Sequence, residues 1–243
     1  MTGPPLEKNM HIGIIADGNR RWAKEKGLPT IEGHKKGLET IEQLITEFAK
    51  TDVKFLTFYV FSNENWSREE AEVSYLMNLA TTKILKLVEK MQKNNLRFIV
   101  LGSKDRLESK LSAKIDEAEE MTKDCTGLTV CFCFNYGGQQ EIADAVKSLA
   151  LNYHHELGMS PSKAEVDKYF SAANLEKHLY RPEIPACDLI VRTSGEQRIS
   201  GFMLWRAAYS EFYFEKKYFP DMNAEDVKKI LKEYQNRHRR FGK

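Results

Sequence analysis

The chain lacks any uninterrupted run of about 18 apolar residues, the length that a membrane-spanning helix requires. Its first ten residues, MTGPPLEKNM, contain neither a basic start nor an apolar stretch, so we predict no secretory signal. An excess of one charge is also missing, since the chain has 37 lysines and arginines and 35 aspartates and glutamates. We therefore expect a cytoplasmic protein, and the charge balance alone predicts no nucleic-acid binding.

Cysteine is scarce, and the spacing of the cysteines does not predict a metal site. Four cysteines occur in 243 residues, without a CxxC pair and without a Cys/His spacing typical of zinc. Cys131 and Cys133 alternate within an apolar run, which is typical of small buried side chains on one face of a strand. We expect free core cysteines in a reducing compartment.

Short apolar segments alternate with amphipathic ones along the chain. The expected strands are nearly continuously apolar, as in strands covered on both faces, and span 12–16, 55–61, 97–101, 128–135 and 189–192. The expected helices span 34–50, 69–93, 104–122, 139–152 and 224–240. Residues 1–10 are interpreted as a flexible lead-in and 11–243 as one domain. The alternation predicts an α/β fold with a mostly parallel sheet flanked by helices.

The expected helix over 69–93 is apolar on more than one side. Apolar side chains between residues 72 and 91 cover more than half of its circumference. Such a helix either packs deeply on both sides or packs on the sheet with one side and lines an apolar cavity with the other.

Asp17 follows the first expected strand directly, where open α/β sheets place their ligands. Gly18 and Asn19 come next and tolerate tight turns with exposed N–H groups. A helix that begins there, together with Arg21, suits a phosphate, and a hard cation would reconcile Asp17 with that anion. The alternative is an aspartate N-cap with surface arginines.

The second expected strand is followed by a polar segment, SNENWSR, over residues 62–68. Its hydrogen-bonding capacity exceeds what a connecting loop needs, which favours a binding role. The plainer interpretation is a strand-to-helix turn in which Ser67 is the N-cap and Glu70 completes a capping box. Both can hold, because a cap would fix the loop that presents the polar groups.

A further expected strand ends in RTSGEQRIS, over residues 192–200. Arg192, Arg198 and Ser200 form a candidate clamp for phosphate oxygens. Glu211 stands among aromatic residues, where a carboxylate needs a partner, and a metal ion shared with Asp17 is one candidate. Together, these features predict two phosphorylated groups and Mg²⁺.

The motifs together resemble one family, the cis-prenyltransferases, typified by undecaprenyl diphosphate synthase. The resemblance covers residues 10–243 and rests on DGN-RWAK (17–24), GHKKG (33–37), SNENWSR (62–68), NYGG (135–138), RTSGE-RIS (192–200), LW–AY-E-YF (204–214) and RRFG (239–242). It implies a homodimeric enzyme with a hydrophobic tunnel, walled in part by the two-sided helix. The implied reaction condenses isopentenyl diphosphate repeatedly onto an allylic diphosphate, such as farnesyl diphosphate, and makes each new double bond Z.

The resemblance also implies roles for single residues. Asp17 and Glu211 are expected to bind Mg²⁺, and Asn65 matches the residue commonly assigned as proton acceptor. Because a carboxamide is barely basic, we expect Asn65 to orient a better acceptor, such as a diphosphate oxygen. The diphosphate of isopentenyl diphosphate is expected at Arg192, Arg198, Ile199 and Ser200. The allylic substrate and the substrate loop are expected at Gly18, Asn19, Arg20, Arg21, Trp22, His34, Ser62, Asn63, Glu64, Trp66 and Arg68.

Several positions depart from the family pattern. Arg20 stands where glycine is usual and Thr30 where an arginine is expected, so Arg20 is expected to replace a missing diphosphate contact. The RTGGE motif appears as RTSGE, with Gly195 retained. The bulk of Val60 and Phe134, where long-chain enzymes commonly have small residues, predicts a narrower or shorter tunnel. The product can therefore be short, medium or of undecaprenyl length.

Two alternatives differ in features that can be tested. A non-catalytic subunit that supports a partner enzyme should lack the acid after the first strand, yet Asp17 is present. A nucleic-acid-binding module could use the basic cluster at 237–240, but a short cluster of this kind is typical of a solvated helix end. Transient membrane contact is compatible with releasing a long prenyl product into lipid, although no segment is an obvious anchor.

Overall fold

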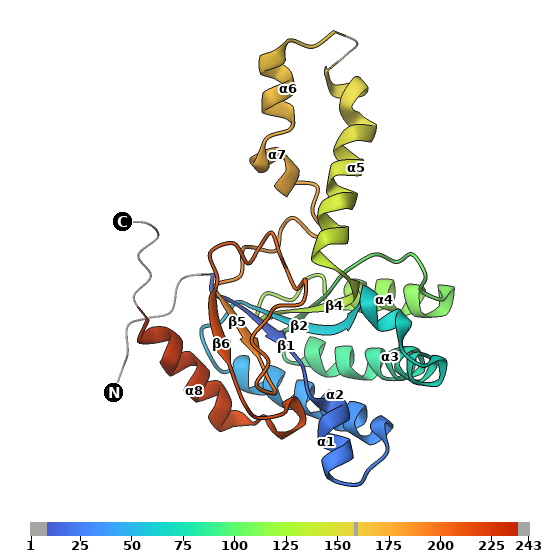
Figure 1. Ribbon diagram of the computed structural model, residues 1–243, viewed down its shortest axis with the longest axis vertical. Coiled ribbons are helices and arrows are strands. Elements are labelled where there is room, and N and C mark those ends of the chain that lie inside the picture. Colours follow the sequence, from blue (N-terminus) through green and yellow to red (C-terminus); the bar gives the residue numbers. More distant parts are fainter. Residues whose placement is uncertain (1–8, 158–159, 238–243) are drawn as a thin grey trace.

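The computed structural model describes residues 9–157 and 160–237. Within these residues the centre is a six-stranded sheet in the order β3-β4-β2-β1-β5-β6, with every neighbouring pair parallel. The strands are β1 (His11–Ile15), β2 (Phe55–Ser62), β3 (Arg97–Leu101), β4 (Thr129–Tyr136), β5 (Leu189–Arg192) and β6 (Glu211–Phe214). The predicted α/β class with a parallel sheet flanked by helices is confirmed (Figure 1).

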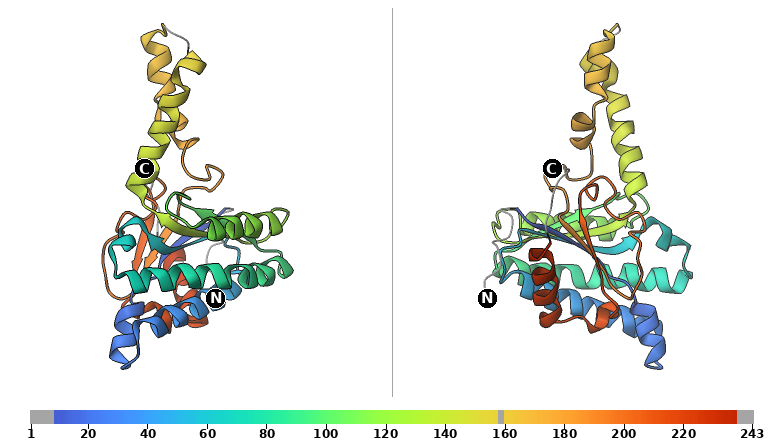
Figure 2. Two further views of the ribbon diagram at one scale, coloured as in Figure 1. Left: turned by 90° about the vertical axis from the view of Figure 1, so that its right-hand side faces the viewer. Right: turned by 60° about the vertical axis from the view of Figure 1, so that its left-hand side comes forward.

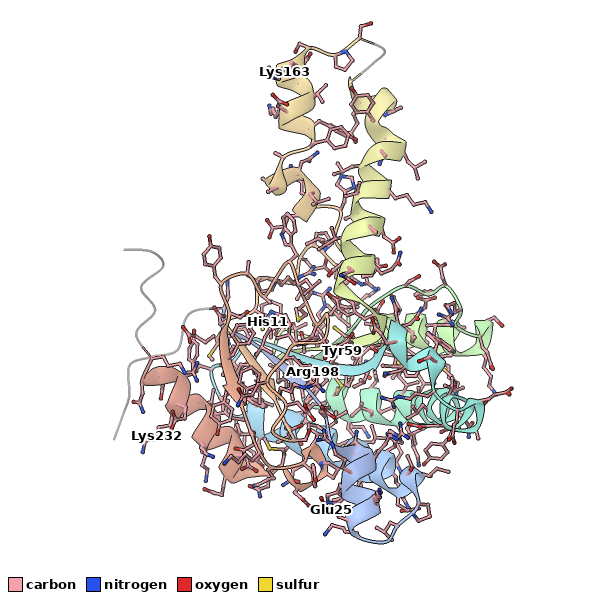
Figure 3. The ribbon with its side chains drawn as sticks, in the orientation of Figure 1. His11, Glu25, Tyr59, Lys163, Arg198 and Lys232 are labelled. Carbon is pink, nitrogen blue, oxygen red and sulfur yellow. The ribbon has the colours of Figure 1, made fainter. Side chains whose placement is uncertain are left out.

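The helices surround this sheet and extend beyond it. They are α1 (Asn19–Glu25), α2 (Thr30–Phe48), α3 (Glu70–Lys93), α4 (Ser109–Met121), α5 (Gly138–Leu157), α6 (Lys163–Tyr169), α7 (Ala172–Glu176) and α8 (Ala224–Gln235), with 3₁₀ turns η1 (Asn63–Ser67) and η2 (Phe219–Asp221). Helices α5, α6 and α7 form an arm that projects from the body (Figure 2). Lys163 marks the far end of this arm, well away from Tyr59 and Arg198 in the body (Figure 3).

Two apolar clusters cover the two faces of the sheet, because successive strand side chains point to opposite faces. Ile12 and Ile14 of β1 belong to the larger cluster, which also holds side chains of α2, α3, α4 and α8. Ile15 belongs to the second cluster, under the segment between α7 and β6. Cys131 and Cys133 are buried together in this second cluster, as expected for core cysteines, and Cys125 is only half-buried.

The predicted elements agree best with the observed ones where the chain is most apolar. The five expected strands match β1 to β5 within one residue at each end. Strand β6 was not predicted, because four residues that alternate in burial at the sheet edge carry little periodic signal. The predicted helix over 104–122 begins late, at Ser109, because Arg106 adopts a left-handed backbone with φ of 72°. Helices α6 and α7 were also not predicted.

Parts of the sequence predictions fall outside this description. Residues 1–8 of the expected lead-in, the RRFG motif over 239–242 and most of the basic cluster at 237–240 are not among the described residues. None of the described helices is both long enough and apolar enough to cross a bilayer.

Candidate active site at the carboxyl edge of the sheet

The carboxyl ends of β1, β2 and β5 meet at one edge of the sheet and border a cleft of about 1270 Å³. Because the three strands are parallel neighbours, loops far apart in sequence converge there. The predicted site residues that line this cleft are Asp17, Gly18, Asn19, Arg20, Arg21, His34, Ser62, Glu64, Asn65, Arg68, Arg192 and Ser200. The structure therefore brings most of the predicted site together.

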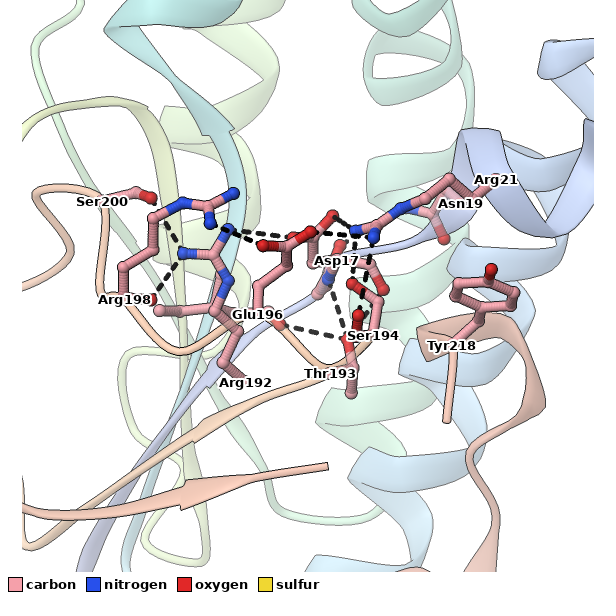
Figure 4. A network of polar contacts seen from close by, with 12 residues as sticks. Asp17, Asn19, Arg21, Arg192, Thr193, Ser194, Glu196, Arg198, Ser200 and Tyr218 are labelled. Atoms are coloured by element: carbon pink, nitrogen blue, oxygen red, sulfur yellow. Dashed lines mark hydrogen bonds and ion pairs between the residues drawn. The ribbon is translucent and has the colours of Figure 1, made fainter. Parts of the chain in front are cut away.

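Asp17 lies at the centre of the polar network (Figure 4). One carboxylate oxygen accepts from Arg192 at 2.9 Å and the other from Arg21 at 3.2 Å. Partial burial opposes ionisation, but the hydrogen bond and charge of Arg192 outweigh it, and Arg21 adds to the effect, so the pKa of Asp17 is lowered. Thr193 ties this loop to the end of β5, because its hydroxyl donates to the Asp17 carbonyl at 2.7 Å. Asp17 is therefore a carboxylate held between two guanidinium groups.

Arg192 organises the predicted second clamp. Its side chain is 5% exposed at the end of β5, and it donates to Ser200 Oγ at 2.8 Å and to the carbonyl of Arg198. Its Nε is buried without a hydrogen-bond partner among the described residues. A buried, unsatisfied donor carries a desolvation cost that a ligand oxygen would relieve. The structure thus brings Arg192 and Ser200 together, and it joins Arg198 to them through its backbone carbonyl.

Glu196 is a member of this network that the sequence analysis missed. It accepts from Arg21 at 2.9 Å and from Arg198, so it bridges the two loops. The hydrogen bond and charge of Arg198 lower the pKa of Glu196, and Arg21 contributes further. Glu196 lies inside the RTSGEQRIS segment, but it is an anion, and the side chains expected to bind phosphate are cations and hydroxyls.

Two glycines allow the first loop to adopt its shape. Gly18 has φ of 103°, and a Cβ there would lie 2.7 Å from the ring of Tyr218. Gly33 on α2 packs against α1 so closely that a Cβ would lie 2.1 Å from the Asn19 carbonyl oxygen. Glycine is the residue that permits both the left-handed turn and the close approach. These contacts fix Asn19, whose Oδ1 is buried without a partner among the described residues.

A second polar cluster stands at the side of the cleft around Glu72 of α3, which the sequence analysis also missed. Glu72 accepts from His34 at 3.0 Å and from Arg68 at 2.9 Å, and Arg20 Nε lies 3.8 Å from its other oxygen. Burial lowers the pKa of His34, and the hydrogen bond to Glu72 offsets only part of that effect. Thr30 also lines the cleft. The cluster connects α1, α2, α3 and the loop after β2.

The loop after β2 is shaped by its own cap. Asn65 Oδ1 accepts from the Ser62 N–H at 3.1 Å, which completes a capping box for η1. The predicted cap at Ser67 is wrong, since Ser67 closes η1 by donating to the Glu64 carbonyl and α3 begins at Glu70. The oxygen of the Asn65 carboxamide is therefore already engaged, and its amino group can only donate.

An apolar cavity of about 160 Å³ continues from the cleft. The two spaces share Ala16, Asn19, His34, Tyr59 and Val60. Side chains of α2, α3, α4 and the sheet line the cavity, among them Leu76, Leu79, Ala80 and Ile84 of α3 and also Phe134. A dry cavity near 150 Å³ accommodates about one benzene molecule. The interpretation of α3 as the wall of an apolar cavity is confirmed.

Some predicted residues lie outside the cleft lining: Trp22, Asn63, Trp66, Arg198, Ile199 and Glu211. Trp22 donates to Asp221 at 2.7 Å, and Ile199 packs against the second apolar cluster. Trp66 donates to Asn135, and Asn63 packs against Gly137.

Glu211 is the predicted residue that the fold separates most clearly from the cleft. It begins β6 and pairs in register with Leu189, which pairs with Ile12 of β1. Asp17 is five residues beyond Ile12, a distance of about 16 Å at roughly 3.3 Å per strand residue. Glu211 instead pairs with Arg237 at 2.9 Å. The prediction that one ion contacts Asp17 and Glu211 of the same chain is therefore wrong.

The described residues contain no group of three or more His, Cys, Asp or Glu side chains that could hold a metal by themselves. Asp17 still fits a Mg²⁺ ion, because this ion commonly uses one or two carboxylates and takes its other ligands from substrate phosphates and water. The hard oxygen donor of Asp17 opens onto a cleft large enough for such phosphates.

Comparisons with known proteins agree with this geometry. Residues 15–242 match the family model described as "Putative undecaprenyl diphosphate synthase". An isoprenyl transferase of Rickettsia bellii is 39% identical over 96% of this chain and 97% of its own length. A ditrans,polycis-undecaprenyl-diphosphate synthase ((2E,6E)-farnesyl-diphosphate specific) of Vibrio vulnificus is 41% identical over 96% and 90%. The crystal structure of lavandulyl diphosphate synthase from Lavandula x intermedia with dimethylallyl diphosphate superposes with a TM-score of 0.89 at 31% identity, covering 97% of this chain and 99% of that one. The chain therefore belongs to the undecaprenyl diphosphate synthase family and is a prenyltransferase.

Proposed function

We propose that the chain adds isopentenyl diphosphate units to farnesyl diphosphate with Z double bonds and makes a polyprenyl diphosphate such as undecaprenyl diphosphate. The observation that carries this proposal is the continuity between the cationic cleft and the apolar cavity, which share Asn19, His34 and Tyr59. A charged head group and a hydrocarbon tail need adjoining polar and apolar spaces. The printed primer specificity of the Vibrio vulnificus relative supports farnesyl diphosphate as the primer.

The two diphosphates are assigned to the two loops that flank Asp17. The allylic diphosphate belongs at the loop with Gly18, Asn19, Arg20 and Arg21, and its tail points into the cavity. The diphosphate of isopentenyl diphosphate belongs at Arg192, Arg198 and Ser200, where the unsatisfied Nε of Arg192 offers a donor. Both loops can be occupied at once because the contacts of Asp17 with Arg192 and Arg21 hold them side by side.

The reaction breaks the allylic C–O bond, joins the electron-poor allylic carbon to the isopentenyl double bond and then removes a proton. Arg21, in the loop assigned to the allylic diphosphate, stabilises the negative charge that develops on this leaving group. A Mg²⁺ ion, when bound at Asp17, supplies further neutralisation of that charge. Asn65 orients the proton acceptor rather than serving as the base, because a carboxamide is barely basic. The substrate loops are supported by the remaining predicted residues, Trp22, Ser62, Asn63, Glu64, Trp66, Arg68 and Ile199.

The apolar cavity supplies affinity for the growing chain. Burial of each methylene contributes about 0.8 kcal/mol, so each five-carbon unit contributes several kcal/mol. A cavity of about 160 Å³ is small for a long product. Longer chains therefore require the half-buried part of α3 that lines the cavity to move outward. The bulk of Val60 and Phe134 limits how far a product extends before that movement.

We also propose a cytoplasmic homodimer that contacts the membrane transiently when its product is released. Phe212 and Phe214 support a dimer, because they are exposed on the edge strand β6 and stack at 6.1 Å. An exposed aromatic pair on a sheet edge is a surface that a second copy can cover. Size-exclusion chromatography with light scattering tests the dimer, and a monomer at micromolar concentration contradicts it.

The enzymatic proposal is tested with purified protein, radiolabelled isopentenyl diphosphate, farnesyl diphosphate and Mg²⁺. We expect elongated products from the wild type and their loss in Asp17→Ala, with the fold of the variant checked by circular dichroism. Absence of elongation by the wild type, or full activity of the variant, contradicts the proposal. A chain that is inactive alone but stimulates a partner enzyme supports the non-catalytic subunit instead.

A further inference from the structure

Outside the cleft, a buried asparagine holds Trp66 of the substrate loop. The indole N–H of Trp66 donates to Asn135 Oδ1 at 2.6 Å, and Asn135 is 3% exposed at the end of β4. The Asn135 amino group donates to the carbonyls of Ser103 at 2.8 Å and Asp105 at 2.6 Å. Both polar atoms of this side chain are thus engaged. Asn135 connects the loop after β2 to the loop after β3.

The backbone around this contact adopts conformations that residues with side chains seldom take. Asn135 has φ of 48° and Arg106 has φ of 72°. At Gly102 a Cβ would lie 1.9 Å from the Phe134 carbonyl oxygen, so the loop after β3 is pressed against β4. Left-handed conformations away from glycine are uncommon and cluster at functional sites. The surrounding structure holds this loop in one shape.

Two further groups fix the indole ring of Trp66. The guanidinium of Arg106 lies over the ring, 4.7 Å from its centroid, and the ring of Phe61 meets it edge-on at 5.1 Å. A cation over an indole face is attracted by its negative electrostatic potential. Trp66 is therefore held at its N–H by Asn135 and at its ring by Arg106 and Phe61.

We propose that Asn135 and Arg106 are positioning residues, which hold Trp66 so that its neighbours Asn65 and Arg68 stand in the cleft. Two hydrogen bonds within the loop shape it locally: Ser62 with Asn65, and Ser67 with Glu64. These two bonds do not fix its position relative to the sheet, whereas the bond to Asn135 ties it to β4, an interior strand. This inference rests on the proposed function, since it concerns how the substrate loop serves that reaction.

Three variants separate the contacts. Asn135→Asp keeps the acceptor for Trp66 and tolerates the left-handed backbone, but it loses the two donors. Asn135→Leu removes all of these hydrogen bonds. Arg106→Asn keeps a residue that tolerates positive φ and removes the cation. Lys104→Asn is the matched control, because Lys104 lies on the same loop and pairs with Asp116 instead.

The expected effects are graded in kcat/KM for isopentenyl diphosphate. Arg106→Asn should lower it by about two- to five-fold, the range for an exposed cation–π contact. Asn135→Leu should lower it by about ten-fold or more, since it leaves the indole N–H and the carbonyls of Ser103 and Asp105 without this partner. The kcat/KM of Asn135→Asp should lie between the values of wild type and Asn135→Leu, and the kcat/KM of Lys104→Asn should equal that of wild type. If Asn135→Leu does not fold, Arg106→Asn decides the outcome.

A double-mutant cycle and fluorescence distinguish positioning from general stability. Trp66→Phe removes the indole N–H, so adding Asn135→Leu to it should cost little more in kcat/KM. The fluorescence emission of Trp66 is isolated as the difference between wild type and Trp66→Phe. Its emission maximum should shift in Asn135→Leu. Additive losses in the cycle, or Asn135→Leu and Arg106→Asn both within two-fold of wild type, would overturn the inference. If the wild type elongates nothing, the proposed function fails, while the emission shift still tests the contact.

Discussion

Arg198 offers the sharpest test of the isopentenyl diphosphate clamp. Its side chain is 61% exposed, and its guanidinium pairs with Glu196, which also pairs with Arg21. Its backbone carbonyl, in contrast, accepts from Arg192 and stays in place when the side chain is removed. Arg198→Ala therefore deletes the exposed cation and leaves the loop that carries Ser200 anchored.

The size of the effect follows from two opposing contributions. A charge-assisted hydrogen bond to a diphosphate oxygen contributes about 1.5–3 kcal/mol. Arg198 must exchange Glu196 for this ligand, and an exposed ion pair of that kind contributes up to about 1 kcal/mol. The net loss of about 0.5–3 kcal/mol corresponds to a rise of about two- to 150-fold in KM for isopentenyl diphosphate. The melting temperature should barely move, because the exposed pair stabilises the fold little.

The assay is steady-state incorporation of radiolabelled isopentenyl diphosphate at saturating primer, over a range that extends well above the expected KM. The control is Arg97→Ala, because Arg97 begins β3 and therefore lies at the opposite edge of the sheet. KM for isopentenyl diphosphate should rise in Arg198→Ala and stay constant in the control. An unchanged KM in a folded Arg198→Ala protein would mean that this arginine does not contact the diphosphate, and the clamp would then be wrongly assigned.

Two other substitutions test the apolar cavity and the buried core. Phe134→Ala should lengthen the products, because Phe134 lines the cavity; chromatography of the dephosphorylated chains measures this, and an identical length distribution would contradict it. Burial lowers the pKa of His11 to about 4, so the unfolded state binds a proton that the native state does not as the pH falls from about 6.5. The free energy of unfolding should therefore drop by about 3 kcal/mol between pH 7 and pH 4, and His11→Gln should remove this part of the slope in urea titrations. A slope that His11→Gln leaves unchanged would assign the pH dependence to other groups.

The strand positions and the edge that carries the site were predictable because both depend on local patterns. Continuous apolar runs locate buried parallel strands, and the polar segments that follow them locate the carboxyl edge. Asp17 and the loop at 62–68 each follow a predicted strand and Arg192 ends one, so strand position alone predicted that they would converge. The edge strand β6 escaped prediction because its four residues alternate between half-buried and exposed.

The partners within the site were harder to predict, because they come from distant parts of the chain. Glu72 accepts from His34, 38 residues away in sequence, and Trp66 donates to Asn135, 69 residues away. Neither acceptor has a local pattern that marks it: Glu72 lies in the first turn of α3, and Asn135 lies inside an apolar strand. The motifs identified many of the residues that line the cleft, whereas tertiary packing selects those that hold them.

Glu211 illustrates why strand direction matters as much as strand identity. Asp17 follows a predicted strand, whereas Glu211 stands among aromatic residues where no strand was predicted. Asp17 lies two residues past the end of β1, whereas Glu211 is the first residue of β6. Because these strands run parallel, an acid at the start of one and an acid past the end of another lie at opposite edges of the sheet, at any strand order. Within one chain, a single ion at the cleft therefore cannot contact both Asp17 and Glu211.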